Sequence, residues 1–193
     1  MKKCEMRAMM KNRLAALDPE ERAAEEAALI SRILAHPLWQ KAKNVFCYIS
    51  FDFEINTYPF LQSALAQGKI LSAPKVIGKG IMEARQITDL SALQTDCYGI
   101  ACPSRQNALV KAEDIALAVV PGLAFDPVSL LRLGRGGGYY DRFLANCGAY
   151  RLAPALACQM VNGRIPREIN DLEMDMVVTA KSVYAKEKES AYL

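Results

Sequence analysis

The residues best suited to chemistry lie in one stretch of the chain, Arg132 to Leu144, which reads RLGRGGGYYDRFL. Four of the five residues from Gly134 to Gly138 are glycine. Each glycine fixed in an ordered loop costs roughly 0.5 to 1 kcal/mol more backbone entropy than alanine would. Glycine also permits positive φ and close approach, so successive backbone N–H groups can converge on one anion. The loop is therefore a candidate phosphate-binding site.

The charged side chains of this stretch fit the same interpretation. Arg132, Arg135 and Arg142 are fixed cations suited to phosphate oxygens. Residues 139–146 have helical spacing, so the loop would lie at a helix N-terminus, where the helix dipole favours anions. Asp141 is the lone carboxylate, and a phosphate would repel it unless a divalent cation lay between them. We interpret Asp141 as a magnesium ligand, direct or through water.

Other interpretations of the glycine loop stay open. The stretch departs from the GxGxxG fingerprint at its sixth position, and the chain contains no GxxxxGK[ST]. A tight turn could use the glycines for packing alone. An Arg-Gly-Gly run with tyrosines also resembles a fragment of an RNA-binding segment, but such segments repeat, whereas this one occurs once between apolar elements.

Length and composition bound the class of protein. The 193 residues suit one domain, spanning 1–193, and 52% hydrophobic with 23% charged residues is ordinary for a globular protein. A net charge of +3 is too small to argue for a nucleic-acid partner. The six cysteines form no CxxC pair, and no apolar run approaches the ~20 residues of a membrane span. We expect a cytoplasmic protein with no membrane or nucleic-acid partner.

Helical patterns account for three segments of the first half. The first 16 residues are strong helix formers. Asp18 has the features of an N-cap, and the helix after it should end at His36, because a proline follows. A third helix is predicted over residues 58–67, with Thr57 as its cap and Gly68 at its end.

Apolar runs between these helices and beyond them predict strands. Their alternation with helices indicates an α/β fold with a largely parallel sheet. Residues 88–112 carry turn signals and receive no assignment. The predicted strands cover residues 45–49, 69–76 (interrupted by Pro74), 82–87, 115–120, 152–158 and 176–179.

Several polar residues would meet at the carboxyl ends of these strands, where α/β sheets bind ligands. The glycine loop follows the 115–120 strand, Glu54 follows the strand before it, and a polar loop could return Asp171 to the same edge. From position alone, Glu54 could equally be an exposed acidic residue. Lys3 and Arg7 stand one helical turn apart, which is also typical of a solvated basic face.

Two sequence segments carry a family resemblance. VPGLAFD, from Val120 to Asp126, followed by RLGRGGGYYDRFL resembles the signature of the 5-formyltetrahydrofolate cyclo-ligases, also called methenyltetrahydrofolate synthetases. The likeness takes in YISFDFEINT around Glu54 and residues 165–179 as well. It implies a three-layer α/β/α domain, expected to be a monomer. The implied reaction is the ATP- and magnesium-dependent conversion of 5-formyltetrahydrofolate to 5,10-methenyltetrahydrofolate, with release of ADP and phosphate.

The resemblance also assigns nucleotide and metal ligands. Lys3 and Arg7 would hold ATP phosphates, and Asp141 and Asp171 would serve the magnesium. The residues implied to wrap the nucleotide are Arg132, Leu133, Gly134, Arg135, Gly136, Gly137, Gly138, Tyr139 and Tyr140.

The folate would lie between Glu54, with Ile49 beneath it, and the residues Arg135 and Tyr139. Arg135 and Glu54 would be the catalytic residues. Phosphoryl transfer to the formyl oxygen would make it a leaving group that the folate N10 displaces, which asks the protein mainly for positioning and charge neutralisation. Because Arg135 and Asp141 are expected on an exposed loop, replacing either with alanine should leave the fold intact.

One departure from the family pattern precedes the glycine loop. Five residues, none of them glycine, separate Asp126 from Arg132, where family members usually have four including a glycine. We expect a reshaped hairpin there. Two rival functions stay open: a phosphate-sugar isomerase or CoA-transfer enzyme, which would bind phosphate without ATP, and an RNA-binding module, whose affinity would fall with salt.

Overall fold

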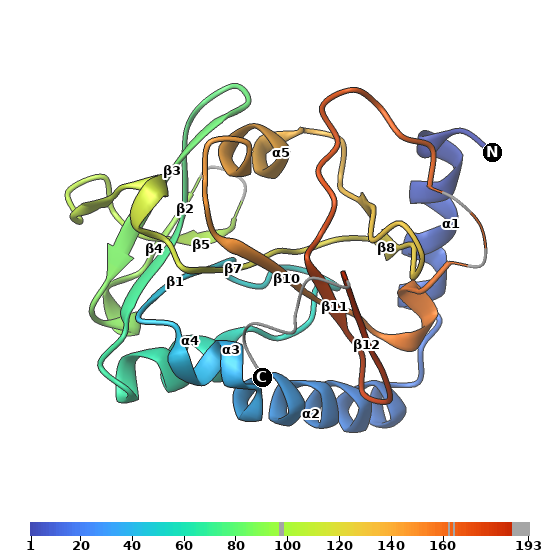
Figure 1. Cartoon of the computed structure of the whole chain (residues 1–193), viewed down its shortest axis with the longest axis horizontal. Coiled ribbons are helices and arrows are strands. Elements are labelled where there is room, and N and C mark those ends of the chain that lie inside the picture. Colours follow the sequence, from blue (N-terminus) through green and yellow to red (C-terminus); the bar gives the residue numbers. More distant parts are fainter. Residues whose placement is uncertain (97–98, 162, 164, 187–193) are drawn as a thin grey trace.

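The computed structural model describes residues 1–96, 99–161, 163 and 165–186. The strands of its main sheet are β1 (Asn44–Cys47), β2 (Ile70–Gly78), β3 (Ile81–Ile87), β6 (Leu109–Val110), β7 (Leu117–Val119), β10 (Tyr150–Pro154), β11 (Met176–Val178) and β12 (Val183–Ala185). Within the described residues they form an eight-stranded sheet with the strand order β12-β11-β10-β7-β1-β2-β3-β6 (Figure 1). Two short hairpins lie outside this sheet: β4 (Gln94–Thr95) with β5 (Ala101–Cys102), and β8 (Ala124–Phe125) with β9 (Arg132–Leu133).

The central strands β11, β10, β7, β1 and β2 are all parallel. Antiparallel pairing is confined to the edges, where β12 joins β11 and the β2–β3 hairpin is extended by β6. The largely parallel sheet and the central place of the 115–120 strand are therefore confirmed. All the central strands have their carboxyl ends on one side, which is the side that carries the glycine loop.

Helices cover both faces of the sheet. The helices α2, α3 and α4 lie on one face and α5 on the other, which confirms the three layers (Figure 1). Strand β1 shows how both faces become buried, because Val45 and Cys47 join the core beneath α2, whereas Phe46 points to the other side and stacks on Phe143 of α5 at 4.9 Å between ring centroids. The helices are α1 (Lys3–Ala15), α2 (Pro19–Ala35), α3 (Pro37–Lys41), α4 (Tyr58–Ala66) and α5 (Tyr139–Leu144), with 3-10 turns η1 (Leu90–Ala92), η2 (Ala112–Asp114) and η3 (Ala157–Gln159).

The predicted start and end of α2 are confirmed. The Asp18 carboxylate accepts hydrogen bonds from the backbone N–H groups of Glu20 and Glu21 at 2.9 and 3.0 Å. The helix ends at Ala35, and His36 then caps α3, because its Nδ1 accepts from the Leu38 N–H at 3.2 Å. These caps satisfy backbone donors that a helix start otherwise leaves unpaired.

The predicted cap residue of α4 is confirmed in position but not in its side-chain hydrogen bond. Thr57 has helical φ and ψ and makes no side-chain cap bond, although Gly68 ends the helix region in a left-handed conformation as predicted. The Thr57 hydroxyl instead accepts from the Ser50 N–H at 2.9 Å, and Asn56 Oδ1 accepts from the Tyr58 N–H at 3.0 Å. The Thr57 carbonyl accepts from the Leu61 N–H at 3.1 Å and so starts the helix, while its side chain closes the loop between β1 and α4.

Two strand predictions also need correction. Strand β2 runs through Pro74 without interruption. The Ile70 N–H donates to the Lys43 carbonyl just before β1, so the backbone N–H groups of every second residue of β2 point towards β1. The pairing with β1 nevertheless stops at Ser72. Pro74 has no N–H to donate, and the strand tolerates it because the pairing with β1 has already stopped. Strand β10 stops at Pro154 instead of continuing to Cys158, and β12 was not predicted.

Residues 88–112, which carried no assignment, contain η1 and the short strands β4, β5 and β6 in their described part. Residues 97–98 of this segment lie outside the described residues. No helix in the described part of the chain combines the length and apolar character needed to cross a membrane.

Candidate active site

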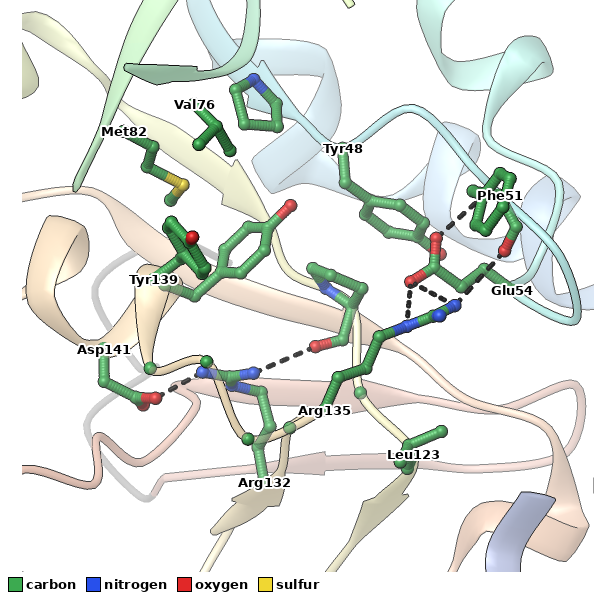
Figure 2. Close-up of a pocket in the computed structure, with 18 of the residues that line it drawn as sticks. Tyr48, Phe51, Glu54, Val76, Met82, Leu123, Arg132, Arg135, Tyr139 and Asp141 are labelled. Atoms are coloured by element: carbon green, nitrogen blue, oxygen red, sulfur yellow. Dashed lines mark hydrogen bonds and ion pairs between the residues drawn. The ribbon is translucent and has the colours of Figure 1, made fainter. Parts of the chain in front are cut away.

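A cavity of about 510 Å³ lies at the carboxyl ends of the central strands (Figure 2). Four segments far apart in sequence contribute to it: α1, the loop after β1, the glycine loop, and the loop before β11. Every residue that the sequence singled out as a candidate, except Arg142, lines this cavity, although their roles stay predictions. They are Lys3, Arg7, Ile49, Glu54, Arg132, Leu133, Gly134, Arg135, Gly136, Gly137, Gly138, Tyr139, Tyr140, Asp141 and Asp171.

The glycine loop brings guanidinium groups unusually close to its backbone. Gly136 and Gly138 have φ of +105° and +63°, a backbone conformation that residues with a side chain rarely adopt. A Cβ at Gly136 would lie 3.3 Å from Cζ of Arg7, whose Nε donates to the Gly134 carbonyl at 2.9 Å. A Cβ at Gly134 would lie 2.8 Å from Nη1 of Arg132. The glycines therefore make room for cations against the loop, which suits an anionic ligand.

Arg132 and Asp141 form a largely buried ion pair. The side chain of Arg132 is only 5% exposed and that of Asp141 19%, and Nη2 donates to Oδ1 at 2.9 Å. Arg132 Nη1 also donates to the Pro121 carbonyl at 3.3 Å, and its guanidinium lies 5.6 Å from the Tyr140 ring centroid. Asp141 therefore lies beside a buried cation and not on an exposed loop.

The hairpin before Arg132 is closed by side-chain hydrogen bonds. Asp126 closes the turn by accepting from the Val128 N–H at 2.9 Å and from the Ser129 hydroxyl at 2.8 Å. Leu130 has φ of +57°, a left-handed conformation that glycine would adopt without strain. Despite this extra residue, Arg132 reaches the cavity.

Arg135 bridges the glycine loop and the loop that carries Glu54. Its Nε donates to Glu54 Oε1 at 3.1 Å and its Nη2 donates to the Phe51 carbonyl at 3.3 Å (Figure 2). Its guanidinium lies 4.8 Å from the Phe53 ring centroid. The other Glu54 oxygen accepts from the Phe51 N–H at 3.0 Å. Burial raises the pKa of Glu54 above its ordinary value, while the Arg135 guanidinium opposes that rise.

Lys3 ties α1 to the loop before β11. Its ammonium lies 2.5 Å from Asp171 and 3.3 Å from Glu168. The Leu172 N–H donates to Asp141 Oδ1 at 3.4 Å, so Asp171 is brought to the neighbourhood of Asp141 as predicted. Within the described residues no three or more metal-ligating side chains cluster together. Magnesium usually takes only one or two protein carboxylates together with substrate phosphates, so such a cluster is not required.

One predicted phosphate-binding cation lies elsewhere. Arg142 does not line the cavity, and its Nε donates to the Gly80 carbonyl at 2.8 Å, while Nη2 donates to Gly137. It therefore fastens the β2–β3 turn to the glycine loop. Its helical position could not reveal this, because the partner lies about 60 residues away in sequence.

An apolar wall of the cavity was not predicted. It is formed by side chains from β2, β3 and the β4–β5 hairpin, and Tyr48 adds a buried phenol whose pKa is raised mainly by burial. The sequence signals were the strand patterns of 69–76 and 82–87, which say nothing about what these strands face. The wall comprises Pro74, Val76, Met82, Ile100, Ala101 and Cys102.

Comparison with known proteins identifies the family of this chain. The model of the 5-formyltetrahydrofolate cyclo-ligase family matches residues 1–180. The chain belongs to this family. Members of the cyclo-ligase family convert 5-formyltetrahydrofolate to 5,10-methenyltetrahydrofolate with ATP. The comparisons support neither the isomerase or CoA-transfer alternative nor an RNA-binding module.

Individual cyclo-ligases and synthetases resemble the chain over nearly its full length. The 5-formyltetrahydrofolate cyclo-ligase of Mus musculus is 30% identical over 187 residues, which cover 90% of this chain and 91% of the mouse protein. The NMR structure of 5,10-methenyltetrahydrofolate synthetase from Aquifex aeolicus superposes with a TM-score of 0.86 at 31% identity, covering 97% of this chain and 94% of that one. A synthetase from Mycoplasma pneumoniae, 18% identical with a TM-score of 0.74 and coverage of 93% and 99%, shares the fold.

Proposed function

We propose that this chain carries out the ATP-dependent ring closure of 5-formyltetrahydrofolate in the cavity at the carboxyl ends of the sheet. The contact between Arg135 and Glu54 carries the proposal, because it joins the glycine loop to the loop that carries Glu54 across one cavity. The γ-phosphoryl group would pass to the formyl oxygen, and N10 would then attack the formyl carbon and expel phosphate. Both steps need reactants held in contact and charge neutralised.

The nucleotide would lie along the glycine loop. Lys3 and Arg7 would hold its phosphates from α1, and the segment Arg132 to Tyr140 would surround it. The supporting observation is that guanidinium groups pack so closely against these glycines that a Cβ would crowd them. Backbone N–H groups and arginines there stabilise the negative charge of the transferring phosphoryl group.

Asp141 and Asp171 would hold the magnesium ion. The ion would neutralise charge on the phosphates during transfer. Both carboxylates line the cavity beside cations, and Asp171 is paired with Lys3. Hard carboxylate oxygens near bound phosphates fit the preference of magnesium.

The folate would lie between the two loops. Glu54 would accept hydrogen bonds from it, Ile49 would support it from beneath, and Arg135 and Tyr139 would approach from the glycine loop. The apolar wall described above offers a surface for flat rings.

The function is tested by following methenyltetrahydrofolate absorbance in a mixture of purified protein, 5-formyltetrahydrofolate, ATP and Mg²⁺. We expect product to appear only with ATP, in a ratio of one ADP to one product. Product formation without nucleotide, or ATP hydrolysis without product, would contradict the proposal.

Metal removal should abolish the same activity. We expect EDTA in excess over Mg²⁺ to stop product formation, and renewed Mg²⁺ to restore it, because the free phosphates and the carboxylates repel one another without the ion. Circular dichroism of the EDTA-treated protein serves as the control for folding. Full turnover in EDTA would contradict the proposal that Asp141 and Asp171 hold a magnesium ion needed for the reaction.

The pH dependence should report on Glu54. A carboxyl group is protonated below its pKa, so kcat/KM for folate should fall as the pH drops through the raised pKa of Glu54, above its ordinary 4.5. Glu54→Gln should lose this acid limb together with most of its folate affinity. In Arg135→Ala the limb should move to higher pH, because the opposing cation is gone. An acid limb that is identical in wild type and Glu54→Gln would belong to another group.

We also propose that the protein works as a monomer in the cytoplasm. One chain supplies every residue of the proposed site, and the cysteines described as free, Cys4, Cys47, Cys102, Cys147 and Cys158, suit a reducing compartment. Light scattering during gel filtration measures the first point.

A further inference from the structure

The loop that carries Glu54 is fastened from outside the cavity by helix α2. Arg22 Nη2 donates to two consecutive carbonyls, those of Phe53 at 2.9 Å and Glu54 at 3.0 Å. Arg22 Nε donates to Glu26 Oε1 at 2.8 Å, one helical turn further along α2. The other oxygen of Glu26 accepts from the Asn56 N–H at 3.3 Å. One ion pair on α2 thus holds the loop backbone at three points.

These contacts reach the backbone of the loop and not the cavity itself. Neither Arg22 nor Glu26 lines the cavity, whereas the Glu54 side chain points into it and meets Arg135 (Figure 2). The main chain around Glu54 is therefore held on one side by α2, and its carboxylate is presented on the other.

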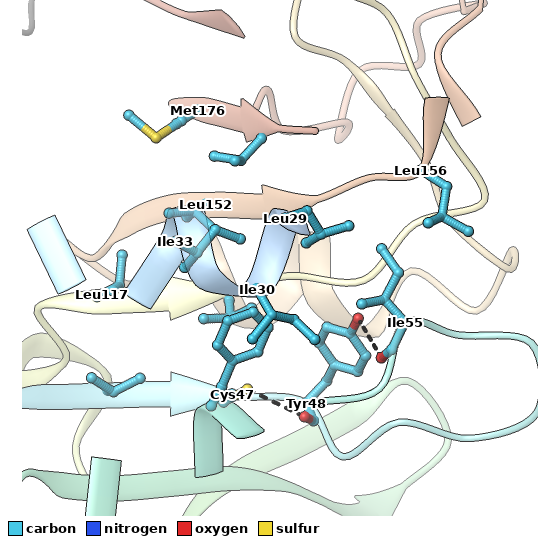
Figure 3. Packing of buried hydrophobic residues seen from close by; sticks show 14 of the residues in the cluster. Leu29, Ile30, Ile33, Cys47, Tyr48, Ile55, Leu117, Leu152, Leu156 and Met176 are labelled. Atoms are coloured by element: carbon cyan, nitrogen blue, oxygen red, sulfur yellow. Dashed lines mark hydrogen bonds between the residues drawn. The ribbon is translucent and has the colours of Figure 1, made fainter. Parts of the chain in front are cut away.

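The loop needs such support because it contains a strained turn. Asp52 has φ of 60°, in the left-handed region that non-glycine residues seldom adopt. Strained backbone persists only where surrounding contacts hold it, and it concentrates at functional sites. On the far side of the turn the Tyr48 hydroxyl donates to the Ile55 carbonyl at 3.2 Å (Figure 3). Arg22 holds the main-chain carbonyl of Glu54 itself.

Helix α2 is a rigid base for this support. Its residues Leu29, Ile30 and Ile33 are buried against the central strands (Figure 3). Because the helix is anchored in the core, the Arg22 guanidinium has a fixed base and can hold the loop backbone in one position.

We propose that Arg22 is a positioning residue for the reaction: with Glu26 it holds residues 53–56 so that the Glu54 carboxylate faces Arg135 across the cavity. This inference rests on the proposed function, since Glu54 is its folate-binding group. The planar fork of arginine is essential, because it reaches two carbonyls and a carboxylate together, whereas a lysine ammonium is a point charge without that geometry.

The test is steady-state kinetics of Arg22→Gln with folate and ATP varied separately. We expect kcat/KM for folate to fall roughly tenfold to a hundredfold, which is the scale of a misplaced catalytic group, with KM for ATP unchanged. Arg22→Lys should recover part of the loss. The acid limb of the pH profile should also move, because the environment of the Glu54 carboxylate changes.

Arg32→Gln is the matched control. Arg32 lies on the same helix and donates one hydrogen bond to a carbonyl, that of Ala180 at 3.0 Å, away from the cavity. We expect its kinetics to equal wild type, so a selective folate defect in Arg22→Gln would not reflect general loss of an arginine from α2.

The outcomes separate this inference from the proposed function. Wild-type protein that forms no methenyltetrahydrofolate would refute the function. An active wild type with unchanged folate kinetics in a folded Arg22→Gln would refute only the positioning role, as would equal losses for folate and ATP. If Arg22→Gln does not fold, Glu26→Gln replaces it, because that change keeps the arginine and weakens its anchor. A folate-selective defect in Glu26→Gln supports the role, and its absence overturns it.

Discussion

Replacing Arg135 with alanine should reduce turnover about a hundredfold to a thousandfold, as expected for loss of one preorganised transition-state donor. The reason is its place between the glycine loop and Glu54, where it can stabilise charge on the transferring phosphoryl group. Its side chain is 40% exposed, and exposed ion pairs contribute only about 0 to 1 kcal/mol, so thermal stability should hardly change. Steady-state turnover together with a melting curve measures both effects.

Arg167→Ala is the control for the loss of one positive charge. Arg167 is 62% exposed, pairs with Glu173 at 2.8 Å and does not line the cavity, so its turnover should stay normal. The turnover of Arg135→Lys should lie between that of wild type and that of Arg135→Ala, because lysine keeps the positive charge but lacks the planar guanidinium group. Normal turnover of Arg135→Ala would show that its guanidinium takes no part in the reaction.

Asp141→Ala should lose activity and stability together. The sequence alone predicted an intact fold for this variant, but the structure places Asp141 against a guanidinium that is only 5% exposed. Removing one partner of a buried pair leaves an uncompensated charge and costs about 3 to 5 kcal/mol. Even the lower figure, about 3 kcal/mol, should reduce Tm by roughly 6 to 12 °C in a protein of this size. Chemical denaturation with a fluorescence readout gives the free energy of unfolding.

The double variant Arg132→Met/Asp141→Ala separates the two losses. It removes the stranded charge as well, and apolar replacement of a buried pair is often neutral for stability. We therefore expect stability to return towards wild type while turnover stays absent. A double variant as unstable as Asp141→Ala alone would mean that the stability loss has another origin than the unpaired guanidinium.

The sequence was most informative where local chemistry decides the structure. Asp18 and the proline after it define the start of α2, and the run 115–120 had to become a buried central strand. The residues of the candidate site emerged from the glycine loop together with the family resemblance. The structure then brought them to one cavity.

Long-range contacts could not be predicted in the same way. Arg22 and Glu26 look like an ordinary surface pair at i and i+4, because nothing local shows that the guanidinium reaches a loop more than 30 residues away. Asp141 looked exposed because its buried partner could not be inferred from spacing. Thr57 and Asn56 both suit a helix cap, and the loop geometry decided between them.

The early end of the pairing between β1 and β2 also affects the polarity of the cavity wall. Strand β2 continues past Ser72, the last of its residues that pairs with β1. Beyond that point an N–H group of β2 on the β1 side has no partner in the β1–β2 ladder, and such an unpaired amide would attract water. Pro74 stands at this point and lines the cavity, offering ring carbons in place of a donor. The pairing of β1 with β2 thus stops beside the cavity, where the lining residue of β2 has no N–H that would need a partner.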